Sequence, residues 1–173
     1  LELRVEAIQI CLVEKGENAP GDISRPFVEQ GKVEYSSHVQ NIGWQNYVNN
    51  GNTSGTVGEG LRLEALKIRL GDNSYEGNIE YSTHVQDYGW MNYSSNDSIS
   101  GTIGQSKRIE AIKIRLTGEI SNYYDVLYRV QCQDFGWLGW TCNDRIAGTT
   151  GGGYRIESIQ IKLYPKNITN LGI

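Results

Sequence analysis

The chain has 173 residues, of which 16 are basic and 20 acidic, giving a formal net charge of −4 and a sequence pI of about 5.2. Because the Lys and Arg residues are scattered along the chain, no basic patch can neutralise a phosphate backbone, and we expect no nucleic-acid partner. No apolar run reaches the roughly 18 residues that span a bilayer, so we expect no membrane insertion either.

The first predicted element is the strand-like segment RVEAIQICL at 4–12, whose pattern returns three times further along the chain. The start at Leu1, without an initiator Met, indicates an excerpt of a longer protein whose export signal would lie upstream. The predicted organisation is an orphan repeat strand at 1–12, a linker or insertion at 13–32 and a threefold β-repeat domain at 33–173, with repeats at about 33–78, 79–125 and 126–164.

Each repeat contains three related segments at nearly constant spacing, and such a period decides the architecture before any local propensity does. The opening segments are VEYSSHVQNIGW at 33–44, IEYSTHVQDYGW at 79–90 and VLYRVQCQDFGW at 126–137. The middle segments are SGTVG at 54–58, SGTIG at 100–104 and AGTTG at 147–151. The closing segments are RLEALKIRL at 62–70, RIEAIKIRL at 108–116 and RIESIQIKL at 155–163.

Apolar residues alternate with period two in these segments, which predicts strands with one buried and one solvated face. The phase slips at Ala65 and Leu66, as expected of a β-bulge. We therefore predict an all-β, pseudo-threefold single domain of three four-stranded repeats. A β-prism is favoured because long strands with charged outer faces suit open sheets, and the β-trefoil is the alternative.

The three cysteines are Cys11, Cys132 and Cys142, an odd count without metal-ligand spacing, so we predict no metal and no other cofactor. If the segment between Cys132 and Cys142 folds back as a hairpin, the two could form a disulfide. Two half-buried free thiols are the equally open alternative.

Four tryptophans are candidate ligand-binding residues, because a flat indole face matches the CH face of a pyranose. For Trp44, Trp90 and Trp137 the favoured interpretation is a core anchor, since each is fixed after Gly in its repeat. Trp140 occurs in the third repeat only, in a turn-rich segment, so we expect it to be exposed and a sharper ligand candidate.

Polar residues two positions apart on the first strand of each repeat share one face and are further candidates. They could hydrogen-bond sugar hydroxyls or bond backbone groups at the repeat junctions, and both interpretations stay open. They are His38 with Gln40, His84 with Gln86, and Gln131 with Gln133. Arg–Glu pairs with the same spacing, such as Arg62 with Glu64, are interpreted as contacts between repeats or as a solvated sheet face.

No Ser elbow, Cys–His pairing, phosphate loop or metal-binding His spacing occurs in the chain, so we predict no enzymatic activity and no catalytic residue. A glycosidase needs two carboxylates that converge in a cleft, and nothing in the sequence brings a pair together. A glycan hydrolase is therefore the lowest-ranked alternative.

The segments HVQNIGWQ, HVQDYGWM, SGT with a following Gly, and RLEALKIRL resemble the clostridial hydrophobic W (ChW) repeats, over residues 31–164 and in part over 3–12. The resemblance implies a secreted or cell-surface bacterial protein. It also implies a carbohydrate- or cell-wall-binding and adhesion module, with polysaccharide, cell-wall glycan or other surface proteins as partners. A structural or protein-interaction spacer is the alternative. The third repeat departs from the pattern at Gln131 and Cys132, which alters any site that needs the His.

Overall fold

The structure, a computed structural model, describes residues 10, 12, 14–16 and 30–166. The orphan strand predicted at 1–12 lies outside the described residues except for 10 and 12, and so does the thiol of Cys11. Most of the predicted linker is likewise not described. Within the described part of the chain, no helix is long and apolar enough to cross a membrane.

Each repeat forms two long strands and three short ones. The first repeat has β1 (Val33–Val39), β2 (Gly43–Trp44), β3 (Val48–Asn49), β4 (Ser54–Gly55) and β5 (Leu63–Leu70). The second has β6 (Asn78–Val85), β7 (Gly89–Trp90), β8 (Ser94–Ser95), β9 (Ser100–Gly101) and β10 (Ile109–Thr117). The third has β11 (Tyr124–Cys132), β12 (Gly136–Trp137), β13 (Thr141–Cys142), β14 (Ala147–Gly148) and β15 (Ile156–Pro165), preceded by the one-turn helix α1 (Ile120–Tyr123).

The prediction of four strands per repeat is wrong in number, because the second predicted strand divides into two short ones. In the first repeat, Gln45 stands between them and turns its side chain to the backbone of Gly55, whose N–H donates to Oε1 at 2.7 Å. The remaining strands match the segments that the period-two pattern predicts.

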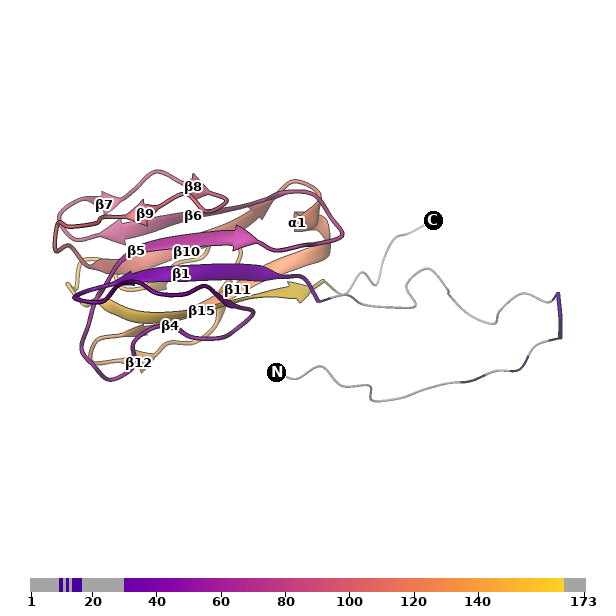
Figure 1. Cartoon of the computed structure of the whole chain (residues 1–173), viewed down its shortest axis with the longest axis horizontal. Helices are drawn as coiled ribbons and strands as arrows, with labels where there is room; N and C mark the ends of the chain where they lie inside the picture. The colour runs from indigo at the N-terminus through magenta and orange to yellow at the C-terminus, as the bar shows by residue number, and fades with distance from the viewer. Residues whose placement is uncertain (1–9, 11, 13, 17–29, 167–173) are drawn as a thin grey trace.

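The two long strands of each repeat pair antiparallel and form the centre of a separate five-stranded sheet (Figure 1). Sheet 1 is built on β1 and β5, sheet 2 on β6 and β10, and sheet 3 on β11 and β15. The all-β, threefold prediction is confirmed, and the described strands form no closed barrel. The finer choice between prism and trefoil stays a prediction.

Each sheet takes one short strand from another repeat. Strand β9 pairs with β5, β14 pairs with β10, and β4 pairs with β15, so the exchange runs through all three repeats and closes on itself. At Gly101 the backbone has φ of 112°, and a Cβ atom would lie 2.4 Å from the carbonyl oxygen of Glu64. The SGT segment therefore needs glycine to let one repeat pack against the next.

Three buried tyrosines join the sheets at the centre of the molecule. The hydroxyl of Tyr81 accepts the backbone N–H of Ile68 at 3.0 Å and donates to the carbonyl oxygen of Ser98. Because β9 covers only part of the edge of β5, the hydroxyl satisfies an N–H that would otherwise be buried without a partner. Tyr35 makes the same contact with Ile161, and Tyr128 with Ile114.

A β-bulge interrupts each long-strand pair, as the slip in the sequence predicts. In sheet 1 the register shifts between His38 and Val39, which lie opposite Ala65 and Leu63, so Glu64 is the extra residue. Sheets 2 and 3 have the same shift, with Glu110 and Glu157 as the extra residues.

Cys132 is buried and Cys142 is half-buried, and both are free thiols. Of the two alternatives left open by the sequence, the structure has the free thiols and not the disulfide, because the register keeps the two cysteines apart. Cys142 lies opposite Leu127, whereas Cys132 lies opposite Gly136 at the far end of β11. Burial raises the pKa of the Cys132 thiol to about 11, with a smaller contribution from the nearby Glu157.

We predict that Tyr81→Phe lowers the free energy of unfolding by about 1–3 kcal/mol, because it leaves the N–H of Ile68 buried without an acceptor. Chemical denaturation measures the change. Tyr88→Phe is the matched control, since that side chain is 59% exposed and its change should stay within about 0.5 kcal/mol. Equal effects of the two substitutions would contradict the bridging role.

We also predict that stability falls in alkali. Burial raises the pKa of Tyr35 and of Tyr81 from the ordinary 10.0 to about 12, and the backbone hydrogen bonds lower it in part. The folded chain therefore holds protons that the unfolded chain releases, so this stability is present below pH 10 and is lost as the pH rises towards 12. Urea unfolding across this range, with phenolate absorbance, should show a smaller drop for Tyr81→Phe than for the unaltered chain.

Candidate functional site

The three repeat tryptophans lie outside the buried core, so the favoured core-anchor interpretation is wrong. Trp44, Trp90 and Trp137 are half-buried. The core is filled by aliphatic side chains and by the tyrosines described above. The reason is register, since Trp44 pairs with His38, whose side chain lies on the outer, polar face of β1. Cross-strand partners share a face, so each indole lies on the outer face of its sheet.

The β-bulge glutamates bring a buried carboxylate to the predicted histidines. Glu64 Oε2 lies 3.2 Å from His38 Nδ1, while Glu64 Oε1 accepts Arg62 Nη2 at 2.8 Å. Sheet 2 repeats the arrangement, with Glu110 Oε2 3.1 Å from His84 Nδ1 and Oε1 bound by Arg108. The Arg–Glu pairs thus lie within one repeat and do not join two repeats, as one of the interpretations had it.

The two ring nitrogens of each histidine have different surroundings. Nδ1 faces the carboxylate, and Nε2 has no hydrogen-bond partner among the described residues. The ring of His38 meets the edge of Trp44 at 5.4 Å between centroids, and His84 meets Trp90 at the same distance. A polar atom that can accept or donate a hydrogen bond therefore stands beside each of these two indoles.

The third repeat lacks this pair. Gln131 is buried, and its Oε1 accepts the hydroxyl of Ser158 at 3.0 Å. Glu157 keeps its arginine, Arg155, which also donates to Gln133 Oε1 at 2.8 Å. Sheet 3 thus presents no imidazole beside Trp137.

Gln40 and Gln86 lie just beyond the strands that carry the histidines, in the turns before β2 and β7. Their backbone N–H groups donate to the carbonyl oxygens of Arg62 and Arg108 at 3.0 Å. Both residues are half-buried, and these contacts of their backbone lie within one repeat.

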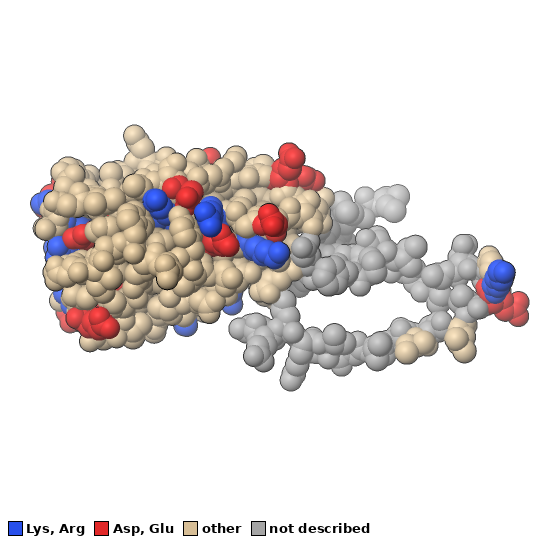
Figure 2. Space-filling model, viewed as in Figure 1, with Lys and Arg blue, Asp and Glu red and all other residues tan. Residues whose placement is uncertain are grey.

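A cation lies over the indole of each repeat, on the outer face of the sheet. Lys67 Nζ is 5.0 Å from the centroid of Trp44, and Lys113 Nζ is 4.5 Å from that of Trp90. In sheet 3 the guanidinium of Arg129 lies 4.8 Å from Trp137. Figure 2 shows basic and acidic side chains next to one another on the face that carries β1 and β5.

A second aromatic residue lies three positions after each repeat tryptophan, and in the first two repeats this residue was not predicted from the sequence. Tyr47 and Tyr93 hold the position that Trp140 holds in the third repeat, and the equal offset from each tryptophan was the available signal. Trp140 is 39% exposed, as predicted. The Tyr47 hydroxyl donates to Asp97 of the next repeat, and burial followed by this hydrogen bond raises the pKa of Tyr47 to about 12.

A cavity of about 420 Å³ lies beside Trp90 on sheet 2. Such a volume falls within the range of small-molecule sites. Its walls are mostly aromatic and apolar, with an amide and hydroxyls among them. They are formed by Tyr88, Trp90, Met91, Asn92, Tyr93, Ser94, Ile99 and Ser100.

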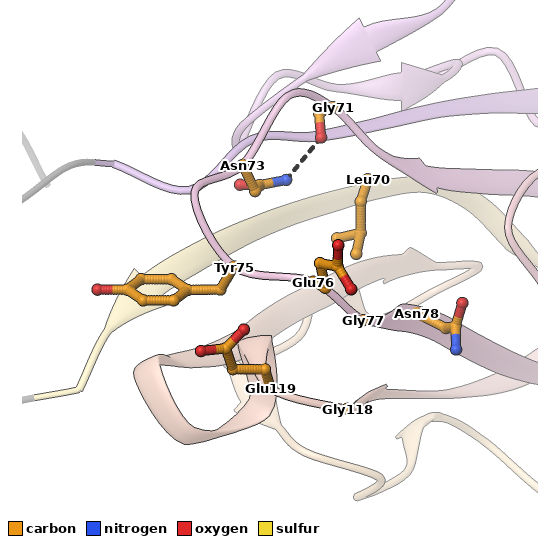
Figure 3. A pocket seen from close by; sticks show the side chains of 9 residues that line it. All are labelled: Leu70, Gly71, Asn73, Tyr75, Glu76, Gly77, Asn78, Gly118 and Glu119. Atoms are coloured by element: carbon orange, nitrogen blue, oxygen red, sulfur yellow. Dashed lines mark hydrogen bonds between the residues drawn. The ribbon is translucent and has the colours of Figure 1, made fainter.

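A larger cavity, of about 660 Å³, lies at the opposite end of the long strands, between the links that join the repeats (Figure 3). Two exposed carboxylates, Glu76 and Glu119, stand in it, and Tyr75 stacks on Tyr123 at 3.5 Å between centroids. None of the residues predicted from the sequence as ligand-binding lies here. Because the two links differ in sequence and length, this cavity does not share the threefold repetition.

The comparisons with known proteins find the same three repeats, with each match starting inside the first long strand of its repeat. The family model described as clostridial hydrophobic W matches residues 38–72, 84–118 and 131–165. Each match begins at the His or Gln beside the β-bulge and runs through the closing long strand. No curated protein and no solved structure matches the chain.

We predict that Glu64→Gln lowers the free energy of unfolding by about 1.5–3 kcal/mol, because a buried carboxylate loses its charge-assisted bonds to Arg62 and its contact with His38 Nδ1. The matched control is Glu34→Gln, whose carboxylate pairs with Arg69 on the surface and should contribute about 0–1 kcal/mol. Denaturation of both variants measures the difference. A loss for Glu64→Gln no larger than for Glu34→Gln would contradict the structural role of the β-bulge glutamate.

Proposed function

Because the chain belongs to the clostridial hydrophobic W family, we propose that it is a non-catalytic module that attaches a secreted or cell-surface protein to polysaccharide, including cell-wall glycan. One observation carries the proposal. An indole that is neither buried nor fully exposed stands on the outer face of all three sheets, and on sheets 1 and 2 a histidine stands beside it. Apolar residues that only fill space would be expected in the core.

The chemistry of these faces suits a sugar. A pyranose stacks its CH face on an indole and gains from apolar burial, while its hydroxyls need donors and acceptors at the ring edge. On sheet 2, Nε2 of His84 and the amide of Asn92 can supply them beside Trp90. Sheet 1 offers the same groups from His38 and Asn46 around Trp44.

Three faces on one body favour attachment over tight recognition of a single molecule. A polysaccharide repeats its unit along the chain, so one polymer can engage more than one face. Linked weak sites then gain on the order of 10²-fold or more in avidity when the geometry allows simultaneous contact. Shallow sites of low individual affinity suffice for this function.

The carboxylates support a non-catalytic role. Glu64, Glu110 and Glu157 are buried and each is bound by an arginine, and none of them lines either cavity. The general acid of a glycosidase is desolvated so that it stays protonated near neutral pH. Glu76 and Glu119, in the cavity between the links, are exposed and lack that environment.

We predict that the double variant Trp44→Ala, Trp90→Ala loses at least about tenfold in retention on the polysaccharide that the unaltered chain binds best, because apolar stacking area is lost on two faces. Pull-down on xylan, β-glucan, mannan and peptidoglycan sacculi measures retention. Glu76→Gln is the control, since its side chain lies in the other cavity and should leave retention unchanged.

The alternative, a spacer or protein-interaction module, makes the opposite prediction. It expects no retention on any of these polymers, and indoles whose fluorescence quenching by iodide is unaffected by millimolar sugar. That combined result would overturn the carbohydrate-binding proposal.

A further inference from the structure

The residues at equivalent positions of the three outer faces differ in charge, and sheet 3 is the face that departs from the other two. On sheet 1, Lys67 and Arg69 are balanced by Glu34 and by Asp97 from the next repeat. Arg69 Nε donates to Glu34 Oε2 at 2.7 Å, and its Nη1 lies 3.9 Å from Asp97. Figure 2 shows this mixture of signs on the face with β1 and β5.

Sheet 2 repeats the balance in every position. Lys113 and Arg115 stand opposite Glu80 and Asp144, and Arg115 Nε donates to Glu80 Oε2 at 2.7 Å. The charges of two basic and two acidic side chains cancel on this face, as they do on the face of sheet 1. Neither face attracts an anion more than a neutral ligand.

Sheet 3 lacks both acids but still carries two cations. On the face of sheet 3, Leu127 stands where the other two faces have Glu34 and Glu80. Gly51, the equivalent in the first repeat of Asp97 and Asp144, stands where those two aspartates reach the faces of sheets 1 and 2. Arg129 replaces a serine, Lys162 keeps the position of Arg69, and Gln160 replaces a lysine. This face thus carries two basic and no acidic side chains at the five equivalent positions, in a chain whose net charge is −4.

Two acids that the long strands of sheet 3 carry, Asp125 and Glu157, are already engaged. Asp125, one outward position before Leu127 on β11, lies 3.5 Å from Lys166 Nζ. Glu157 is buried and bound by Arg155. Arg129 is held by a neutral group, since its Nε donates to Gln160 Oε1 at 2.8 Å. Among the described residues, neither Arg129 nor Lys162 has a carboxylate partner.

Both aromatic positions of sheet 3 are indoles, and the two cations lie over them. The guanidinium of Arg129 is 4.8 Å from the centroid of Trp137 and 4.9 Å from that of Trp140, and Lys162 Nζ is 4.4 Å from Trp140. The change from tyrosine to Trp140 accompanies the loss of the aspartate that accepts the tyrosine hydroxyl on the other two faces. The substitutions therefore form one coordinated alteration of the face.

We propose that sheet 3 binds an anionic sugar, a pyranose that carries a carboxylate or a phosphate, and that this face selects acidic polysaccharide. The proposal rests on the carbohydrate-binding function proposed above and assigns a substrate class to one of its faces. The sugar ring stacks on Trp137 and Trp140, and its anionic group pairs with Arg129 and Lys162. A guanidinium matches the two oxygens of such a group, and the indoles keep the cations in place.

The experiment compares matched polymers with and without charge. Polygalacturonate and its fully methyl-esterified form share one backbone, as do phosphomannan and mannan. We expect the unaltered chain to bind each acidic polymer about tenfold more tightly than its neutral partner at about 0.05 M salt, and to lose this preference at about 0.5 M. A preference for only one acidic polymer identifies the anion as carboxylate or phosphate.

Variants place the preference on sheet 3. Arg129→Gln with Lys162→Gln should abolish it while the chain still binds the neutral polymers through sheets 1 and 2, whereas Arg69→Gln on sheet 1 should leave it intact. Gly51→Asp restores the missing acid and should reduce acidic binding by about tenfold. The fold tolerates this change, because Asp97 and Asp144 adopt φ of 72° and 67° at the same position and a Cβ at Gly51 meets no atom within 4 Å.

Two outcomes separate this proposal from the function on which it rests. Binding to neutral polymers with no preference for the acidic partner, or a preference unchanged in Arg129→Gln with Lys162→Gln, overturns the charge selection alone. Failure to bind any polymer, neutral or acidic, overturns both.

Discussion

The fold depends on three tyrosine hydroxyls buried where the sheets meet. Each of them completes the edge of a long strand that belongs to another repeat, at a point where the short exchanged strand no longer covers it. An edge strand with unpaired N–H groups in a dry interior is unstable. The hydroxyls remove that cost, and so three sheets, each too small to bury its own face, form one body.

The same exchange that closes the body also builds the outer faces. The SGT segment of one repeat lies along the closing strand of another, where the backbone N–H of Thr102 donates to the carbonyl oxygen of Glu64 at 2.8 Å. Glu64 is also the β-bulge residue that orients His38. The β-bulge glutamate therefore takes part both in the contact between repeats and in the site on the outer face. In the repeats that have a histidine, the β-bulge turns the carboxylate towards the imidazole.

Repetition lets one face change while the scaffold stays the same. The core tyrosine, the Gly-Thr turn and the β-bulge glutamate occur in all three repeats, whereas the outer residues of sheet 3 differ together. A residue such as Arg129 contacts an indole and an amide on the surface and has no part in the core. The outer face can therefore vary in charge without a loss of folding.

The sequence by itself determined the repeat, the strand type, the β-bulge and the family, because periodicity and recurrence are properties of the chain alone. It could not determine the side of the sheet on which Trp44 lies, since that depends on the pairing of β2 with β1. It also missed the contact between Glu64 and His38, which are 26 positions apart, and left open whether Cys132 pairs with Cys142. Those contacts are set by strand register and by the exchange between repeats, which exist only once the three sheets have packed together.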